Sequence, residues 1–249
     1  MARILEVCID SLASARSAIR GGADRLELCS ALALGGLTPY TALLHQIREE
    51  SDTPIRCLIR PRPGDFLYGP EEIDLMARQI HELKQAGSDG FVIGCLTENG
   101  DLDAVSMEPL IDAASGCELT LHRCIDLSRN PQDTYLQAAE LGIDTVLTSG
   151  AKNNCIHGIP TIETLLNLRD LCNGPEVLIG AGVNSENIQI LINALPKACA
   201  FHASCKELIE SKMIFRRPDI PMGLPGLDEW HIQQSDEQKV RCLKQVLNL

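Results

Sequence analysis

The sequence predicts an α/β fold: a single parallel eight-stranded (β/α)₈ TIM barrel formed by residues 1–249. Its length is close to the roughly 250 residues typical of that fold. Short apolar runs alternate with longer amphipathic segments, which predicts parallel strands joined by right-handed helical crossovers. Hydrophobic residues make up 45% of the chain but aromatic residues only 3%. The core must therefore be aliphatic, as is typical of parallel sheets covered by helices on both faces.

Eight segments have the pattern of short buried strands, and eight amphipathic segments alternate with them. The predicted strands are Ile4–Asp10, Arg25–Ser30, Ile55–Arg60, Gly90–Leu96, Glu118–Arg123, Thr145–Ser149, Val177–Ala181 and Cys199–Ala203. The predicted helices lie near residues 11–21, 39–50, 70–86, 102–115, 131–141, 160–172, 185–195 and 236–247.

One turn sequence recurs before three of the predicted strands. It reads Gly22-Ala23-Asp24, Gly87-Ser88-Asp89 and Gly142-Ile143-Asp144. A glycine can take the left-handed conformation that ends a helix, and a short polar Asp can close the turn into the strand. We expect these turns at the amino-terminal end of the barrel, away from any chemistry.

Residues 211–234 form the least regular stretch of the sequence, directly after the eighth predicted strand. We interpret it as an irregular loop. Long loops without secondary structure are often functional lids, so one expectation is that it covers one end of the barrel. The alternative is a contact with another subunit or a simple surface excursion.

Charge and composition exclude several classes of partner. The net charge is −12 and no basic stripe occurs, so we expect no nucleic-acid partner. No run approaches the ~18 apolar residues of a membrane span, and the first residues lack a signal-peptide core, which predicts a cytoplasmic protein without a membrane partner. The 11 cysteines include no C-x-x-C pair, and we interpret most of them as small buried residues.

The first two predicted strands carry polar residues on the face that should point into the barrel. Residues along a strand alternate between two faces. Glu6 and Cys8 share one face of the first strand, and Glu27 and Cys29 share one face of the second, opposite aliphatic neighbours that must meet the helices. A buried carboxylate is costly unless it is paired, so these two require cationic partners.

Candidate partners follow other strands at their carboxyl ends, where barrel enzymes place their chemistry. Glu27 or His122 can move a proton, and Arg60 can bind an anion. The alternative is an interior salt-bridge network that only specifies packing. The catalytic candidates are Glu6, Glu27, Arg60, His122 and Asp126.

Anion binding is the second candidate activity. Arg62 can join Arg60 in clamping a carboxylate or phosphate, and the glycine-bearing ends of the sixth and seventh strands can hold a phosphate with backbone N–H groups. In the alternative interpretation, Gly182 makes a tight turn and Asn184 or Ser185 caps the next helix. The anion-binding candidates are Arg62, Ser149, Gly150, Gly180, Gly182 and His202.

Cys8 and Cys29 are the metal candidates. They lie on adjacent parallel strands, which are about 4.8 Å apart, and we expect the two inward thiols to be in register. Two thiolates suit Cu(I), which accepts few, soft ligands. The alternative is that both cysteines are packing residues.

The sequence resembles the CutC copper-homeostasis family over nearly its whole length, up to about residue 223. The matching motifs are Leu5-Glu6-Val7-Cys8, residues 21–30, Gly35-Gly36-Leu37-Thr38-Pro39, Ile59-Arg60-Pro61-Arg62, Gly64-Asp65-Phe66, Thr120, His122-Arg123, Asp126, residues 146–150, Gly180-Ala181-Gly182-Val183 and His202-Ala203-Ser204. The resemblance implies a cytoplasmic (β/α)₈ barrel that forms homo-oligomers, dimers or tetramers, and binds Cu(I) through Cys8 and Cys29.

This sequence departs from the family pattern at Pro63, Leu121, Ile125 and Cys205 and in residues 218–225. None of these changes removes a polar member of the site, but each can alter the shape of the pocket. Two functions follow. One is a copper-homeostasis protein that binds Cu(I) at the carboxyl-terminal face of the barrel. The other is a barrel enzyme acting on a small anionic or phosphorylated metabolite. Neither implies an organic cofactor.

Overall fold

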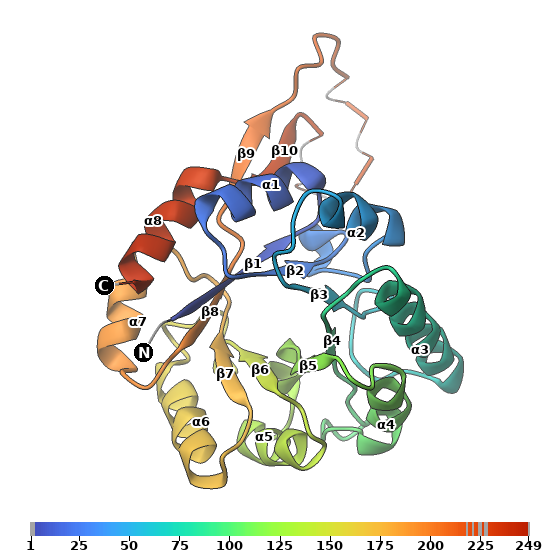
Figure 1. Ribbon diagram of the computed structural model, residues 1–249, viewed down its shortest axis with the longest axis vertical. Coiled ribbons are helices and arrows are strands. Elements are labelled where there is room, and N and C mark those ends of the chain that lie inside the picture. Colours follow the sequence, from blue (N-terminus) through green and yellow to red (C-terminus); the bar gives the residue numbers. More distant parts are fainter. Residues whose placement is uncertain (1–2, 218, 221, 224–225, 227–228, 249) are drawn as a thin grey trace.

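Eight parallel strands close into a barrel that is surrounded by a ring of helices (Figure 1). The computed structural model describes residues 3–217, 219–220, 222–223, 226 and 229–248. Each barrel strand is hydrogen-bonded to the next one in the chain, and the eighth returns to the first. The predicted fold class is confirmed. No helix in these described ranges is both long enough and apolar enough to cross a membrane.

The barrel strands are shorter than the sequence pattern suggested, mostly at their carboxyl ends. They are β1 (Ile4–Ile9), β2 (Arg25–Leu28), β3 (Ile55–Leu58), β4 (Gly90–Ile93), β5 (Glu118–Leu121), β6 (Thr145–Thr148), β7 (Glu176–Ile179) and β8 (Ala200–Ala203). Arg60 and His122, expected inside strands, lie just beyond them. These residues are buried like strand residues, but the backbone of Arg60 bonds Thr38 in a loop.

The helices agree with the predicted segments to within a few residues. They are α1 (Leu12–Gly21), α2 (Thr41–Arg48), α3 (Pro70–Gln85), α4 (Ala104–Ala113), α5 (Pro131–Glu140), α6 (Ile159–Cys172), α7 (Ile188–Ala194) and α8 (Glu237–Leu247). Two short 3₁₀ helices, η1 (Leu32–Leu34) and η2 (Arg123–Leu127), follow β2 and β5.

The repeated Gly-x-Asp turns lie where the sequence predicts them. Gly22, Gly87 and Gly142 all have positive φ and end helices, a conformation that glycine adopts at little cost. Asp24 accepts the backbone N–H of Leu5 at 2.7 Å, and the corresponding aspartates before β4 and β6 accept the first or second N–H of β3 and β5. Each aspartate therefore ties the amino end of one strand to the turn that begins the next.

An aliphatic layer lies between the barrel and the helices. Leu5, Val7 and Ile9 of β1 are fully buried on the outward face, in contact with the main core cluster. The alternate residues of the same strand face inward, which confirms the predicted alternation. The barrel interior is therefore free to hold polar side chains.

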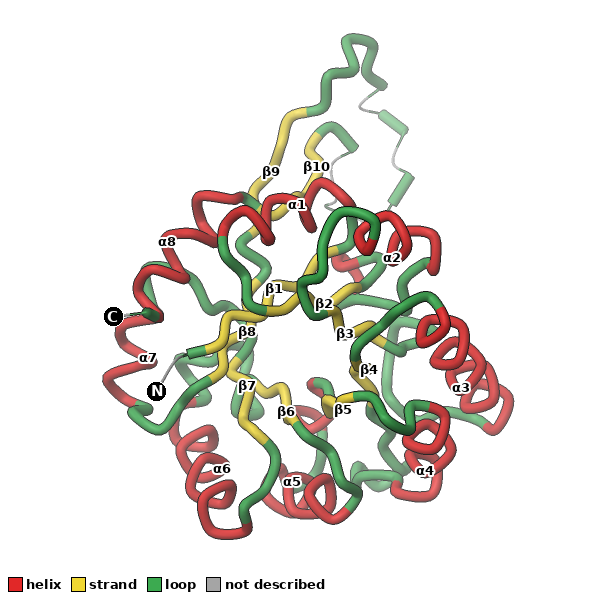
Figure 2. Tube along the Cα trace, in the orientation of Figure 1, coloured by secondary structure: helices red, strands yellow, loops and turns green. Residues whose placement is uncertain are grey.

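A two-stranded antiparallel ribbon follows the barrel, formed by β9 (Lys206–Glu210) and β10 (His231–Ser235). The sequence prediction of an irregular loop over 211–234 was wrong at its end, where 231–234 pair with β9. Ser235 N–H donates to Ser14 Oγ of α1 at 3.1 Å, which anchors the base of the ribbon. The ribbon extends outward past α1, away from the barrel (Figure 2). Residues 218, 221, 224–225 and 227–228 of the expected lid lie outside the described residues.

Candidate functional site

A pocket of about 390 Å³ lies at the carboxyl ends of the strands. It is partly apolar and partly charged. Seven of the predicted site residues line it: Cys8, Glu27, Cys29, Arg60, His122, Asp126 and His202. The other lining residues are Leu32, Leu34, Gly35, Leu58, Phe66, Arg123, Leu127 and Leu147.

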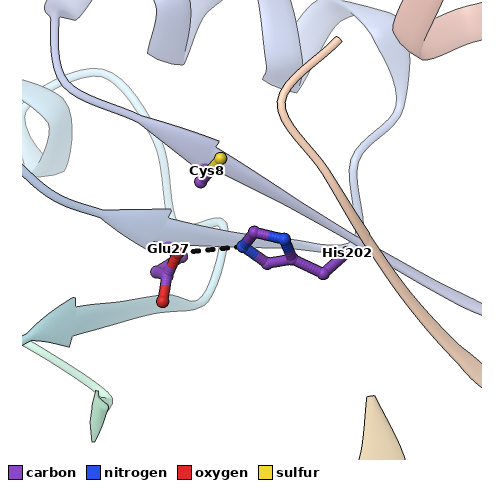
Figure 3. Close-up of side chains that lie close together, drawn as sticks. All are labelled: Cys8, Glu27 and His202. Atoms are coloured by element: carbon purple, nitrogen blue, oxygen red, sulfur yellow. Dashed lines mark hydrogen bonds and ion pairs between the residues drawn. The ribbon is translucent and has the colours of Figure 1, made fainter. Parts of the chain in front are cut away.

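Three of these residues lie close enough together for one metal ion to reach all of them. One ligand atom each of Cys8, Glu27 and His202 lies within 4.8 Å of the other two. They come from β1, β2 and β8, and His202 Nε2 lies 2.9 Å from Glu27 Oε2 (Figure 3). A sulfur, an imidazole nitrogen and a carboxylate oxygen together suit Cu or Zn better than a hard cation.

The strand register differs from the expected one. Cys8 lies opposite Glu27, not Cys29, and Glu6 lies opposite His202. The expectation that the two thiols are in register was therefore wrong. Closing a barrel requires adjacent strands to be staggered, and this stagger places Cys29 one inward position beyond Cys8. Cys29 lines the pocket but does not belong to the three-residue group.

Burial and charge set the protonation of this region. Burial raises the pKa of the Cys29 thiol well above its usual value, and electrostatic interactions with the neighbouring Glu27 and Cys8 add to the effect. For His202, burial alone lowers the pKa, but the neighbouring Cys8 and Glu27 outweigh it and raise the pKa well above its usual value. His202 is therefore an imidazolium paired with the Glu27 carboxylate.

Glu6 lies in a deeper layer of the barrel than the pocket. It is fully buried, does not line the pocket, and forms an ion pair with Arg25, which lies directly opposite on β2. We expected a partner among Arg60, Arg62, His122, Arg123 and His202. His202 Nε2 is 3.9 Å from Glu6 Oε1, but the hydrogen-bonded partner is Arg25. The pairing of Glu6 with Arg25 could have been inferred from the sequence, because Arg25 shares the inward face of β2 with Glu27.

Asp126 occupies the place where an external anion was expected. Its carboxylate accepts Thr148 Oγ1 at 2.6 Å, Ser149 N and Ala151 N at 3.0 Å, and Ser149 Oγ at 2.8 Å. Arg123 Nε also donates to it at 2.7 Å. The loop after β6, which includes Ser149 and Gly150, therefore binds a carboxylate of the same chain.

The remaining anion candidates lie apart from the pocket. Gly180 bonds Thr148 within the barrel, where an added Cβ would be 2.7 Å from a side-chain carbon of Leu147. Beyond Gly182, Asn184 Oδ1 accepts the backbone N–H groups of residues 186 and 187 within a turn. The N-cap of α7 is Asn187, so the expectation that Asn184 or Ser185 caps this helix was wrong. Arg62 forms ion pairs with carboxylates at positions 65 and 72.

Arg60 is buried at the pocket wall, with 8% of its surface exposed. Its guanidinium donates to the carbonyl oxygens of Leu34, Gly36 and Gly64 at 3.1, 3.0 and 2.9 Å. The group also lies 5.2 Å from the centre of the Phe66 ring. Arg60 therefore holds two loops together, while its Nε has no hydrogen-bond partner among the described residues.

His122 is a neutral imidazole fixed in one orientation. Its Nδ1 accepts the backbone N–H of Cys124 at 3.2 Å, and its ring lies 4.6 Å from that of Phe66. Burial, together with the positive charge of Arg60, lowers its pKa from 6.5 to about 3. Because Nδ1 is the acceptor, the proton of the neutral ring is on Nε2. That nitrogen has no partner in the described parts of the chain.

Comparison with known proteins points to one family. The family model described as the CutC family matches residues 3–206. A family protein CutC of Pasteurella multocida is 38% identical over 96% of this chain and 97% of its own length. A human copper homeostasis protein cutC homolog is 36% identical over 98% of this chain and 88% of its own length.

Solved structures agree with this relationship. The CutC protein of Streptococcus agalactiae superposes with a TM-score of 0.76 at 28% identity, covering 81% of this chain and 98% of that one. KGPDC of Streptococcus mutans shares the barrel fold alone. Its TM-score is 0.61 at 13% identity, covering 99% of this chain and 98% of its own. The family match over residues 3–206 and the full-length relatives lead to one conclusion: this chain belongs to the CutC family.

Proposed function

We propose that this protein takes part in copper homeostasis by binding Cu(I) as cargo at Cys8, His202 and Glu27. The observation that carries the proposal is the convergence of their ligand atoms to within 4.8 Å of one another. A relative of similar length is named a copper homeostasis protein. Thiolate and imidazole are ligands that bind Cu(I), and Cu(I) needs few of them.

The residues present fit a soft monovalent ion. Cys8 would supply a thiolate and His202 an imidazole nitrogen, while Glu27 would be a weak third ligand or would orient His202 through their 2.9 Å contact. This ligand set replaces the cysteine pair expected from the sequence. Cys29 is outside the group, and its raised pKa favours the neutral thiol, which is a poor ligand.

A competition titration tests the proposal. The protein is titrated with Cu(I) under anaerobic, reducing conditions against a chromogenic chelator. We expect one high-affinity Cu(I) per chain, and a loss of affinity of at least about 10-fold in Cys8→Ser and in His202→Asn, because outer-shell and ligand changes cost 10–100-fold or more. Cys29→Ser is the matched control, a buried cysteine on the same pocket wall, and should bind as the wild type does.

Two outcomes would overturn the proposal. Unchanged affinity in Cys8→Ser would remove the site altogether. Loss of binding in Cys29→Ser with unchanged binding in His202→Asn would restore the cysteine pair and contradict the ligand set. A parallel titration with Zn²⁺ addresses metal identity, because the same ligand types also suit zinc. Tighter binding of Zn²⁺ than of Cu(I) would contradict the copper assignment.

A further inference from the structure

We propose that the pocket binds a small organic carboxylate, which pairs with Arg60 and accepts hydrogen bonds from Arg60 Nε and His122 Nε2. This inference goes beyond the copper proposal and does not depend on it. The two sites would occupy different parts of the pocket wall, which all these residues line.

The first argument is charge balance inside the barrel. Three arginines are buried there, and Arg25 and Arg56 each form an ion pair with a glutamate. Arg60 has no carboxylate partner in the described part of the chain and bonds only backbone carbonyl groups. Buried charges are normally paired, because an unpaired one is costly in a poorly solvated interior. An anionic ligand would supply the missing charge.

Asp126, a carboxylate that lines the pocket, does not supply that charge. It pairs with Arg123 and accepts hydrogen bonds from the loop after β6. One ligand carboxylate would give Arg60 the kind of ion pair that Arg25 and Arg56 already have, which favours a monocarboxylate.

The second argument is the pair of unused donors. Arg60 Nε and His122 Nε2 are both buried, and neither has a hydrogen-bond partner among the described residues. Leaving a buried donor unsatisfied costs about 1–3 kcal/mol, so two such donors on residues that line the pocket call for an acceptor. Carboxylate oxygens accept such bonds strongly.

The donors are held in position before any ligand arrives. Phe66 lies against both the Arg60 guanidinium and the His122 ring. A Cβ at Gly94 would lie 2.5 Å from His122 Cε1, so the His122 ring also packs directly against the backbone at Gly94. Locked side chains lose little entropy on binding, which is the general basis of preorganised recognition.

The rest of the wall identifies the ligand class. Leu32, Leu58, Leu147 and Phe66 give the pocket an apolar surface, and its volume of about 390 Å³ is within the range of small-molecule sites. Two free donors match the two oxygens of a carboxylate, whereas a phosphate has more oxygens to satisfy. A short branched or aromatic carboxylate fits both the charge and the apolar surface.

Isothermal titration of the metal-free protein with isovalerate and with benzoate tests the proposal. Isovaleramide has the shape of isovalerate without its charge, and inorganic phosphate has charge without an apolar body. We expect saturable binding of at least one carboxylate, at least 10-fold weaker binding of the amide, and weaker binding of phosphate. Equal binding of acid and amide, binding of phosphate alone, or no binding of either acid would overturn the proposal.

A pair of His122 variants separates the donor from the fold. His122→Asn can keep the acceptor for Cys124 N–H but removes the Nε2 donor, whereas His122→Gln places an amide N–H near the original Nε2 position. We expect at least 10-fold weaker carboxylate binding in the Asn variant and partial retention in the Gln variant. Arg60→Met should abolish binding. Wild-type binding in folded His122→Asn or Arg60→Met would refute the assignment, and Cu(I) affinity measured on the same variants reports separately on the copper proposal.

Discussion

The burial of neutral His122 makes the stability of this protein sensitive to acid. In the folded state its pKa is about 3, against 6.5 for an ordinary histidine. Between these two values the unfolded chain takes up a proton that the folded protein does not. The contribution of His122 to stability is therefore fully present above pH 6.5 and is lost progressively as the pH drops from 6.5 towards 3.

The size of the effect at pH 5 follows from linkage. The unfolded histidine is then 1.5 pH units below its pKa, while the folded one remains neutral. At about 1.4 kcal/mol per unit, His122 alone should reduce the free energy of unfolding by about 2 kcal/mol relative to pH 7. Substitution by asparagine, which does not titrate, should remove this part of the acid sensitivity.

Urea unfolding of the metal-free wild type and of His122→Asn, at pH 7 and pH 5 in a buffer without carboxylates, measures the difference. The wild type should lose about 2 kcal/mol more than the variant between the two pH values. His157→Asn, a change at an exposed histidine, is the control and should behave as the wild type does. Equal losses in the wild type and His122→Asn would refute the view that His122 is buried in its neutral form.

Three further predictions concern the supports of the site and the ribbon. Glu6→Gln leaves the charge of Arg25 buried without its carboxylate, so thermal or urea unfolding should show that the free energy of unfolding falls by about 3–5 kcal/mol. The exposed control Glu50→Gln should leave Tm unchanged. A Tm of Glu6→Gln equal to that of the wild type would contradict a buried ion pair. Asp126→Asn removes the charge that accepts several hydrogen bonds, and the same measurement should show that the free energy of unfolding falls by at least about 2 kcal/mol. A free energy of unfolding equal to that of the wild type would contradict this role of Asp126. Ile214, in the segment between β9 and β10, is 99% exposed, so we expect it to contact a second copy of this protein. Ile214→Asp should therefore lower the molecular mass measured by light scattering. An unchanged mass would place the contact elsewhere.

Alternation along the strands made much of the site predictable. The faces of β1 and β2 could be read from their aliphatic residues, so Cys8, Glu27 and Cys29 were correctly expected to point inward. Arg60 and His122 were correctly expected near the carboxyl ends of strands. These inferences needed only the period of a strand and the need to cover its apolar face.

Other features depend on geometry that a local pattern does not contain. The stagger between β1 and β2 is a property of the closed barrel, so the pairing of Cys8 with Glu27 could not be derived from either strand alone. The contact of Asp126 with the loop after β6 joins residues 22 to 25 positions apart. Ser149 and Gly150 were interpreted as a site for an external anion, because the sequence does not show that the Asp126 carboxylate of the same chain occupies that site.

The ligand set of the copper proposal is tested most directly by X-ray absorption at the copper edge of the Cu(I)-loaded wild type and Cys29→Ser proteins. If Cys8 and His202 bind the ion, both spectra should show one sulfur ligand together with imidazole nitrogen, and Cys29→Ser should not change them. Two sulfur ligands without nitrogen in the wild type, reduced to one in Cys29→Ser, would contradict the account and assign the ion to the cysteine pair.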